Sequence, residues 1–153
     1  MLENRLEERL EDFKKAFKKL KESTDLKVEN DIVKETPTNV GVSDSHQIKN
    51  LGSLLIDGVI QRFEFTFEQS WKLMKLYLEY EGIEEAKSPR STIRAAFKYG
   101  IIEDGDPWIN MMIDRNKTSH VYDESTAIEI YNSIKSNHVN LLEKLLNKME
   151  EIL

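Results

Sequence analysis

Residues 51–80 are the stretch that decides the fold, and they read LGSLLIDGVIQRFEFTFEQSWKLMKLYLEY. Apolar side chains recur in it at intervals of three and four residues, the spacing that aligns them on one face of an α-helix. This main stripe comprises Ile56, Ile60, Phe63, Phe67, Trp71, Met74 and Leu78. A second apolar set lies outside the stripe and comprises Leu55, Phe65, Leu73, Leu76 and Tyr80. Because a helix that is apolar on so many sides needs cover on more than one side, we expect it to pack inside its own bundle and against a second copy of the chain.

Three charged residues, Arg62, Glu64 and Glu68, interrupt this apolar surface. Charged side chains in such positions are most often paired with neighbours on an exposed edge. Less often they line a polar site, and the sequence leaves both interpretations open.

Amphipathic helices are predicted at both ends of the chain. Residues 1–22 carry leucine and phenylalanine at helical spacing, with acids in the first half and lysines in the second, as the helix macrodipole favours. Asp123 can cap a final helix that runs to the end of the sequence. The inner line of that helix comprises Ala127, Ile130, Ile134, His138, Leu141, Leu145, Met149 and Ile152. His138 is therefore most simply a core or interface histidine.

Two shorter helices are predicted between these elements. Ser88 and Pro89 have the residue types of an N-cap and a first helical turn, and Gly100 can end that helix. Asp106 and Pro107 predict the start of a second short helix in the same way. The residues expected to point inward are Ile93, Ala96 and Phe97 in the first and Trp108, Met111, Met112 and Ile113 in the second.

Periodicity fades between Ser23 and Asn50, where Pro37, Gly41 and several polar residues occur. We expect a flexible or irregular connection there and assign it no function, and we interpret His46 within it as a surface histidine. The helices on either side of the connection predict one all-α domain over residues 1–153. Its predicted architecture is an up-and-down antiparallel four-helix bundle with an additional short helix, forming a homodimer.

Composition narrows the function. The chain has 153 residues and no cysteine, and the absence of cysteine excludes disulfides. Its net charge of -6 argues against a protein that coats nucleic acid through bulk charge. The sequence has no apolar run of membrane-spanning length and an acidic start unlike a signal peptide, so we expect a cytoplasmic protein with no membrane association. It also lacks a glycine-rich phosphate loop and a His-Glu-x-x-His motif, and we expect neither a cofactor nor a metal.

One local basic stripe stands against the acidic average. Lys87, Arg90, Arg94 and Lys98 are spaced by three and four residues with no acid between them. Arg90, Arg94 and Lys98 are candidates to bind the phosphates of RNA or of a nucleotide. The simpler alternative is a solvated helix face.

Four functional groups lie within eight positions near the end of the second short helix: Arg115, Asn116, His120 and Tyr122. Metal-free RNA cleavage must move a proton from the ribose 2′-hydroxyl and a proton to the leaving oxygen, which a histidine can do near neutral pH. It must also hold the charged phosphate, which suits the forked guanidinium of an arginine. The alternative is a hydrogen-bonded helix end in which Arg115 pairs with Asp114 or Asp123.

The spacing of this group favours a dimer. Arg115 and His120 lie about 140° apart on an ideal helix, so one copy does not easily aim both at one phosphate. A two-fold dimer that places two such edges face to face removes this difficulty.

The same residues carry a resemblance to a known family. Residues 115–122, RNKTSHVY, match the Arg-x4-His-x-Tyr pattern of HEPN domains. The segments that look like signatures of the nucleotidyltransferase substrate-binding protein family within that group are QRFEFTFEQSWK at 61–72, SPR at 88–90 and DRNKTSHVYDE at 114–124. The resemblance covers Leu51 to about Ile134 well and the terminal helices in character.

This resemblance implies a dimeric helical bundle that works with a small nucleotidyltransferase in a two-gene, toxin-antitoxin-like module. It further implies a metal-independent ribonuclease toxin in which Arg115 and His120 are catalytic, Asn116 is a supporting polar group and adenylylation of Tyr122 silences activity. The alternative is a non-catalytic subunit that presents a nucleotide or other substrate to the nucleotidyltransferase, so whether the chain is an enzyme stays open. The connection from Ser23 to Asn50 looks longer than that of the family.

Overall fold

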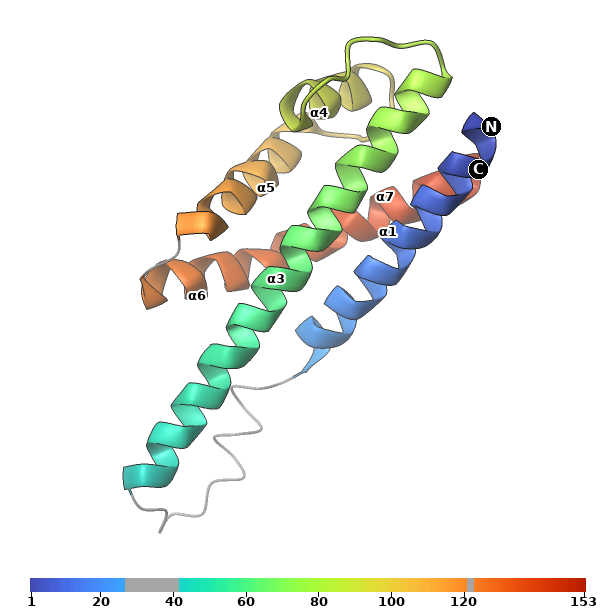
Figure 1. Cartoon of the computed structure of the whole chain (residues 1–153). Coiled ribbons are helices and arrows are strands. Elements are labelled where there is room, and N and C mark those ends of the chain that lie inside the picture. Colours follow the sequence, from blue (N-terminus) through green and yellow to red (C-terminus); the bar gives the residue numbers. More distant parts are fainter. Residues whose placement is uncertain (27–41, 121–122) are drawn as a thin grey trace.

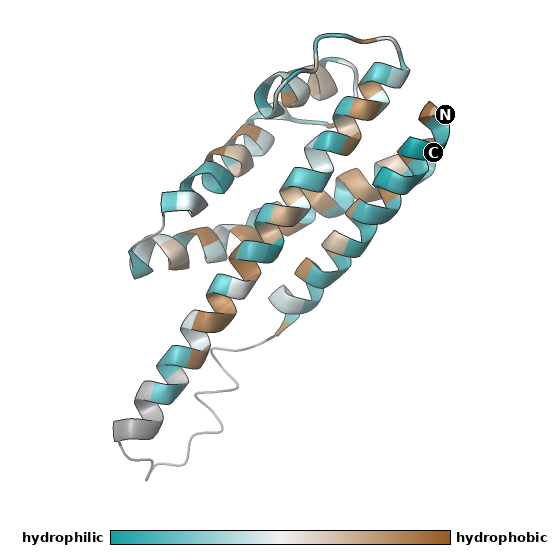
Figure 2. Ribbon diagram, viewed as in Figure 1, coloured by the Kyte–Doolittle hydropathy of each residue, from teal (hydrophilic) through white to brown (hydrophobic). Residues whose placement is uncertain are grey.

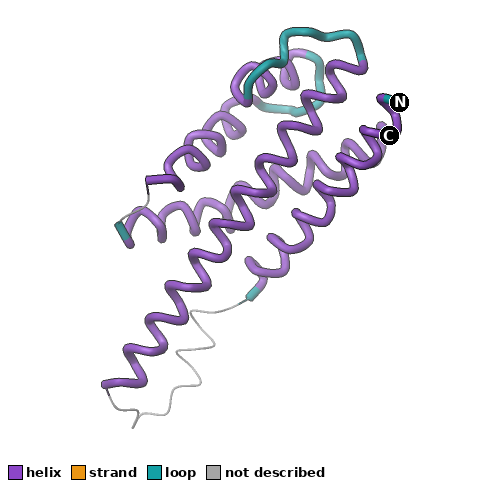
Figure 3. Tube along the Cα trace, in the orientation of Figure 1, coloured by secondary structure: helices purple, strands orange, loops and turns teal. Residues whose placement is uncertain are grey.

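A computed structural model of the chain describes residues 1–26, 42–120 and 123–153, with the backbone alone for residues 42–46 and 48. Among these residues the regular elements are all helices (Figure 3). The predicted all-α fold class is thereby confirmed. The homodimer stays a prediction.

Three long helical segments form the frame of the bundle. Helix α1 (Leu2–Asp25) lies against α3 (Val42–Tyr80), and the two run in opposite directions (Figure 1). The third segment is made of α6 (Glu124–Ser133), a π-helical turn (Ile134–His138) and α7 (Val139–Ile152) in succession. Its first part contacts α3 and its last part contacts α1, so it crosses the other two helices.

The shorter elements cover the remaining side of α3. Helix α4 (Pro89–Lys98) contacts α3 and α5 (Gly105–Lys117), and α5 itself contacts α3 (Figure 1). A single 3-10 turn (Thr118–His120) follows α5. The four-helix bundle with an additional short helix is therefore confirmed, with α4 as the additional helix.

The core follows the predicted apolar stripes. Apolar and polar residues alternate along the long helices, as amphipathic packing requires (Figure 2). The largest fully buried side chains come from every layer of the bundle and include Leu6, Phe13, Leu20, Phe63, Phe67, Met74, Leu78, Ile93, Met111, Ile134 and Leu142. In the described part of the chain, none of the helices is both long and apolar enough to cross a lipid bilayer.

The connection predicted from Ser23 to Asn50 is shorter than expected at both ends. Helix α1 continues through Asp25, and α3 begins at Val42 rather than near Leu51. The hydroxyls of Ser23 and Thr24 donate to the carbonyls of Leu20 and Lys21 three residues back, which is a helical geometry although these residue types suggest a loop. Residues 27–41 and the side chain of His46 lie outside the described residues.

Four local predictions were wrong. The N-cap of α5 is Asp104, not Asp106, because the carboxylate of Asp104 accepts from the backbone N–H of Asp106. The helix therefore begins at Gly105.

The other three concern residues that were expected to point inward. Phe97, Ile113 and Ile152 are 52%, 38% and 37% exposed. Phe97 and Ile113 line open grooves, and Ile152 is the last residue of α7.

Candidate functional site

The site is built where α5 changes into a tighter turn. The hydroxyl of Thr118 donates to the carbonyl of Arg115 over 2.7 Å, and the hydroxyl of Ser119 donates to the carbonyl of Asn116 over 3.0 Å. The backbone N–H of Thr118 also bonds to the carbonyls of Asp114 and Arg115. Side chains and a tightened last turn thus provide partners for carbonyls at the helix end. The chain can therefore leave the α-helix at Lys117 and pass through a 3-10 turn that ends at His120.

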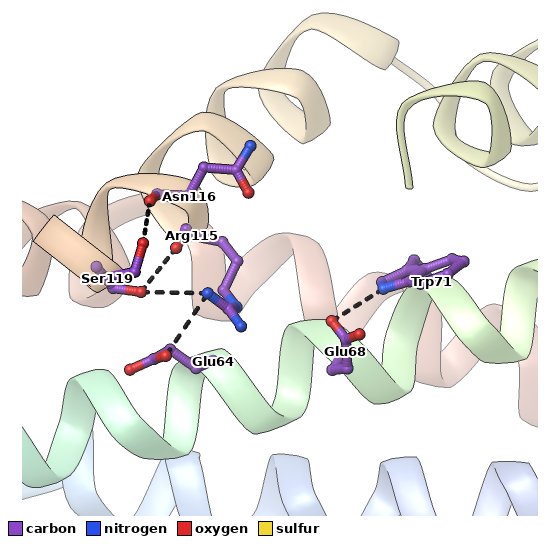
Figure 4. A network of polar contacts seen from close by, with 7 residues as sticks. Glu64, Glu68, Trp71, Arg115, Asn116 and Ser119 are labelled. Atoms are coloured by element: carbon purple, nitrogen blue, oxygen red, sulfur yellow. Dashed lines mark hydrogen bonds and ion pairs between the residues drawn. The ribbon is translucent and has the colours of Figure 1, made fainter. Parts of the chain in front are cut away.

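Arg115 points from α5 toward the middle of α3. Its Nη1 atom lies 3.6 Å from Oε2 of Glu64 (Figure 4) and 3.4 Å from the hydroxyl oxygen of Thr118. Its Nε is buried without a hydrogen-bond partner among the described residues. The alternative in which Arg115 pairs with Asp114 or Asp123 is wrong, because the carboxylate beside it belongs to Glu64.

Asn116 and His120 line a common open groove of about 380 Å³ on another side of the same turn. The remaining described residues that line the groove are Ile113, Lys117 and Thr126. Arg115 is not among them. The structure thus brings Asn116 and His120 together but turns Arg115 toward α3, in keeping with the angular separation expected from the sequence. Tyr122 lies outside the described residues.

The basic stripe lies at the opposite end of α5. Arg90 and Arg94 line a groove of about 430 Å³ that includes Gly105 and Asp106, at the start of that helix. Lys98 is paired, with its Nζ 3.2 Å from a carboxylate oxygen of Glu85. At 1.5 Å per residue, the start of α5 is about 15 Å from Arg115 along the helix axis. Within one chain, the stripe and the turn at His120 are therefore separate surfaces.

Two of the three charged residues that interrupt the apolar surface of α3 bond to neighbouring residues outside the site. Arg62 donates from Nη1 to the carbonyl of Lys19 over 2.8 Å. Glu68 accepts from the indole N–H of Trp71 over 3.1 Å (Figure 4). Glu64 differs from these two residues, because its partner is Arg115, the arginine of the Arg-x4-His-x-Tyr pattern. Nothing in the local sequence around Glu64 indicates this contact.

A buried pair behind the turn was also missed. His138 is 3% exposed, and its Nε2 lies 2.7 Å from Oδ2 of Asp114. Its ring stacks on Phe63 with centroids 5.4 Å apart and planes 17° apart. Burial lowers the pKa of His138, and the Asp114 carboxylate opposes that shift only in part. A signal was available, because Asp114 directly precedes Arg115 and His138 lies on the predicted inner line.

The neutral form of His138 fits this environment. Its Nε2–H then donates to the Asp114 carboxylate, while Nδ1, which has no partner among the described residues, carries a lone pair and not a proton. The described residues also contain no group of three histidine, aspartate or glutamate side chains that could hold a metal ion.

Comparison with known proteins adds the family context. The family described as nucleotidyltransferase substrate binding protein like matches residues 8–151. A Haemophilus influenzae protein named probable ribonuclease HepT is 38% identical over 84 residues. That match spans 52% of this chain and 58% of the relative's length.

Two solved structures have the same fold. One is from Haemophilus influenzae and is described as revealing the fold of a substrate binding domain of a nucleotidyltransferase; it is 26% identical, with a TM-score of 0.76 over 92% of this chain and 98% of that one. The other, from Thermus thermophilus, is 31% identical, with a TM-score of 0.67 over 90% of this chain and 98% of that one. These matches confirm the resemblance seen in the motifs. Because the family match extends over nearly the whole sequence, the chain belongs to the nucleotidyltransferase substrate binding protein like family.

Proposed function

We propose that this protein is a metal-independent endoribonuclease of the HEPN type and the toxin of a cytoplasmic two-gene module. Its antitoxin is a minimal nucleotidyltransferase. The observation that carries the proposal is the groove that Asn116 and His120 line together. The Arg115 guanidinium extends from another side of the same turn, toward Glu64. The name of the Haemophilus influenzae relative, probable ribonuclease HepT, agrees with it.

The chemistry assigns each group a role. His120 accepts the proton of the ribose 2′-hydroxyl, whose oxygen attacks the adjacent phosphorus. The bond to the 5′-oxygen breaks, and that oxygen takes a proton from an imidazolium, leaving a 2′,3′-cyclic phosphate and a 5′-hydroxyl. Arg115 binds the phosphate oxygens as negative charge builds, and Asn116 supports it with its amide.

A second copy of the chain completes the site in this proposal. Leu51, Leu54 and Phe65 are exposed on α3 and lie within about 60° of one another around the helix, away from the core. An exposed apolar strip of this kind suits a two-fold interface between helices. Pairing two chains provides two imidazoles, one as base and one as acid, and a guanidinium from either copy.

The basic stripe and the tyrosine have supporting roles. Arg90, Arg94 and Lys98 bind phosphates of the same RNA strand beyond the cleaved bond. Adenylylation of Tyr122 by the nucleotidyltransferase adds a bulky anion two positions after His120, which blocks access to the groove and repels the RNA phosphate. This assignment of Tyr122 rests on the Arg-x4-His-x-Tyr spacing in the sequence.

The decisive test uses His120→Ala. We expect the purified protein to cleave RNA in the presence of EDTA and its expression to arrest growth, and His120→Ala to abolish both. Asn110→Ala, at an exposed position of α5 outside the groove, is the matched control and retains both activities. Cleavage that survives in His120→Ala would remove the basis of the proposal.

Two observations favour a second candidate function. Glu64 already occupies Arg115, and the related solved structure is described as a substrate binding domain of a nucleotidyltransferase. A non-catalytic subunit would use the same grooves to present a nucleotide or other substrate to its partner. In that case the wild-type protein binds the nucleotidyltransferase and raises its activity but leaves RNA intact.

A further inference from the structure

We infer that His138 is a positioning residue: by holding Asp114, it fixes the last turn of α5 and thus the directions in which Arg115 and His120 point. The catalytic side of this inference rests on the proposed function. The observation behind it is a polar pair at the edge of the hydrophobic core: His138 is 3% exposed, and its Nε2 lies 2.7 Å from Oδ2 of Asp114. A buried polar group costs stability unless it is hydrogen-bonded, and Nδ1 of His138 has no partner among the described residues. A histidine at this position therefore calls for a reason other than packing.

The contacts around His138 link five residues from three helical segments into a closed set, which we call the contact cycle. Asp114 and Arg115 are consecutive on α5, and they bind His138 and Glu64 respectively. Glu64 follows Phe63 on α3, and the ring of Phe63 stacks on that of His138. If the end of α5 rotates about its own axis, at least one of the two polar contacts must break. The contact cycle therefore fixes the rotation of the end of α5. Neither polar contact would fix this rotation alone.

The π-helical turn identifies the same spot independently. The backbone N–H of Val139 bonds to the carbonyl of Ile134, five residues back, so the regular ladder is interrupted where His138 lies. Turns of this kind are rare within helices and often occur at functional sites. Here the irregular turn coincides with the residue that reaches across to α5.

The competing explanation is that His138 only helps the core to pack, and matched variants separate the two. His138→Phe keeps an aromatic ring against Phe63 and removes the donor to Asp114. His138→Gln keeps an N–H donor that can reach that carboxylate. Ile130→Val serves as the packing control. It removes one methylene from a buried residue of the same helical segment that is not part of the contact cycle.

Two measurements are made where circular dichroism shows all variants folded. For RNA cleavage, we expect His138→Phe to lower kcat about tenfold to hundredfold with KM within about threefold, as small misplacements of catalytic groups do. His138→Gln should recover most of the lost kcat, and Ile130→Val should match the wild type. Unchanged kcat in His138→Phe, or an equal loss in Ile130→Val, would overturn the inference.

Hydrogen exchange gives a readout that needs no activity. We expect His138→Phe, but not Ile130→Val, to speed exchange at the amides of Asn116–His120 relative to those of α4. If the wild-type protein cleaves no RNA, the proposed function fails and this comparison still decides the positioning role. Equal exchange in His138→Phe and the wild type would overturn that role whether or not RNA is cleaved.

Discussion

The guanidinium of Arg115 lies beside the carboxylate of Glu64, with 3.6 Å between Nη1 and Oε2, so α3 holds the motif arginine of α5. Both side chains are partly exposed, and such pairs contribute about 0–1 kcal/mol to stability. The contact therefore contributes little to global stability, and its effect is on the charge available at the site and on the direction of Arg115.

This pairing predicts the effect of Glu64→Gln. In the proposed ribonuclease the carboxylate competes with an RNA phosphate for Arg115, so its neutralisation should lower KM for RNA a few-fold, equivalent to about 1 kcal/mol. Steady-state cleavage kinetics measure the change, and Glu79→Gln, at an exposed position near the end of the same helix, provides the control. A raised KM would mean that Glu64 orients the arginine for the phosphate instead of competing with it.

The buried imidazole of His138 predicts a pH dependence of stability. Its pKa is lowered by burial, so between the folded pKa and the ordinary value of about 6.5 the unfolded chain binds more protons than the folded one. The free energy of unfolding therefore has its full value above about pH 6.5 and falls as the pH drops below it. Urea denaturation at about pH 7.5 and about pH 5.5, on either side of that value, should show a larger decrease for the wild type than for His138→Phe. An equal decrease in both proteins would contradict this assignment.

The helices were predictable because each one buries a stripe that recurs in the sequence with the helical period. The stripe of α3 and the inner line of the C-terminal segment are largely in the core as expected. Helix ends were less predictable, because they depend on single hydrogen bonds. Examples are the carboxylate of Asp104, which caps α5, and the hydroxyl of Ser23, which bonds within α1. From local composition alone, an aspartate or a serine at such a position is as compatible with a helix cap as with a loop.

The contacts of the site could not be predicted from local spacing. Asp114 and His138 are 24 positions apart, and they meet only because α5 has one particular rotation against α3 and the C-terminal segment. The sequence indicated which functional groups share the end of α5, including Asn116 and His120. It did not indicate that Glu64 would be the partner of Arg115, since that choice depends on how two helices pack.

If two chains pair through the apolar strip on α3, as proposed, a charge placed in the strip should separate them. Phe65 is 57% exposed in the single chain, and Phe65→Glu introduces a carboxylate that a buried interface would leave unpaired. Light scattering after size-exclusion chromatography should change from dimer to monomer. Tyr99→Glu alters an exposed aromatic residue directly after α4 and should leave the dimer intact. A wild-type protein that is already monomeric, or a Phe65→Glu protein that stays dimeric, would refute this interface.

Tyr122 predicts a covalent change. Incubation with the partner nucleotidyltransferase and ATP should add adenylate to the wild-type chain and stop RNA cleavage, as intact mass and peptide mapping can show. Tyr122→Phe should remain unmodified, and Tyr99→Phe, which lacks an exposed tyrosine elsewhere, should be modified like the wild type. An unaltered mass with a partner of proven activity would contradict the modification.

The π-helical turn also bears on how the chain tolerates changes of length. A turn closed over five residues contains one residue more than an α-helical turn closed over four. Deleting Ser136 or Asn137, which are both exposed, would let the turn relax into regular helix while Leu142 and Met149 keep their places in the core. The shortened protein should therefore fold, with a regular helix in place of the π-helical turn. The extra residue is thus not needed for folding, and this position of the chain tolerates a change of length.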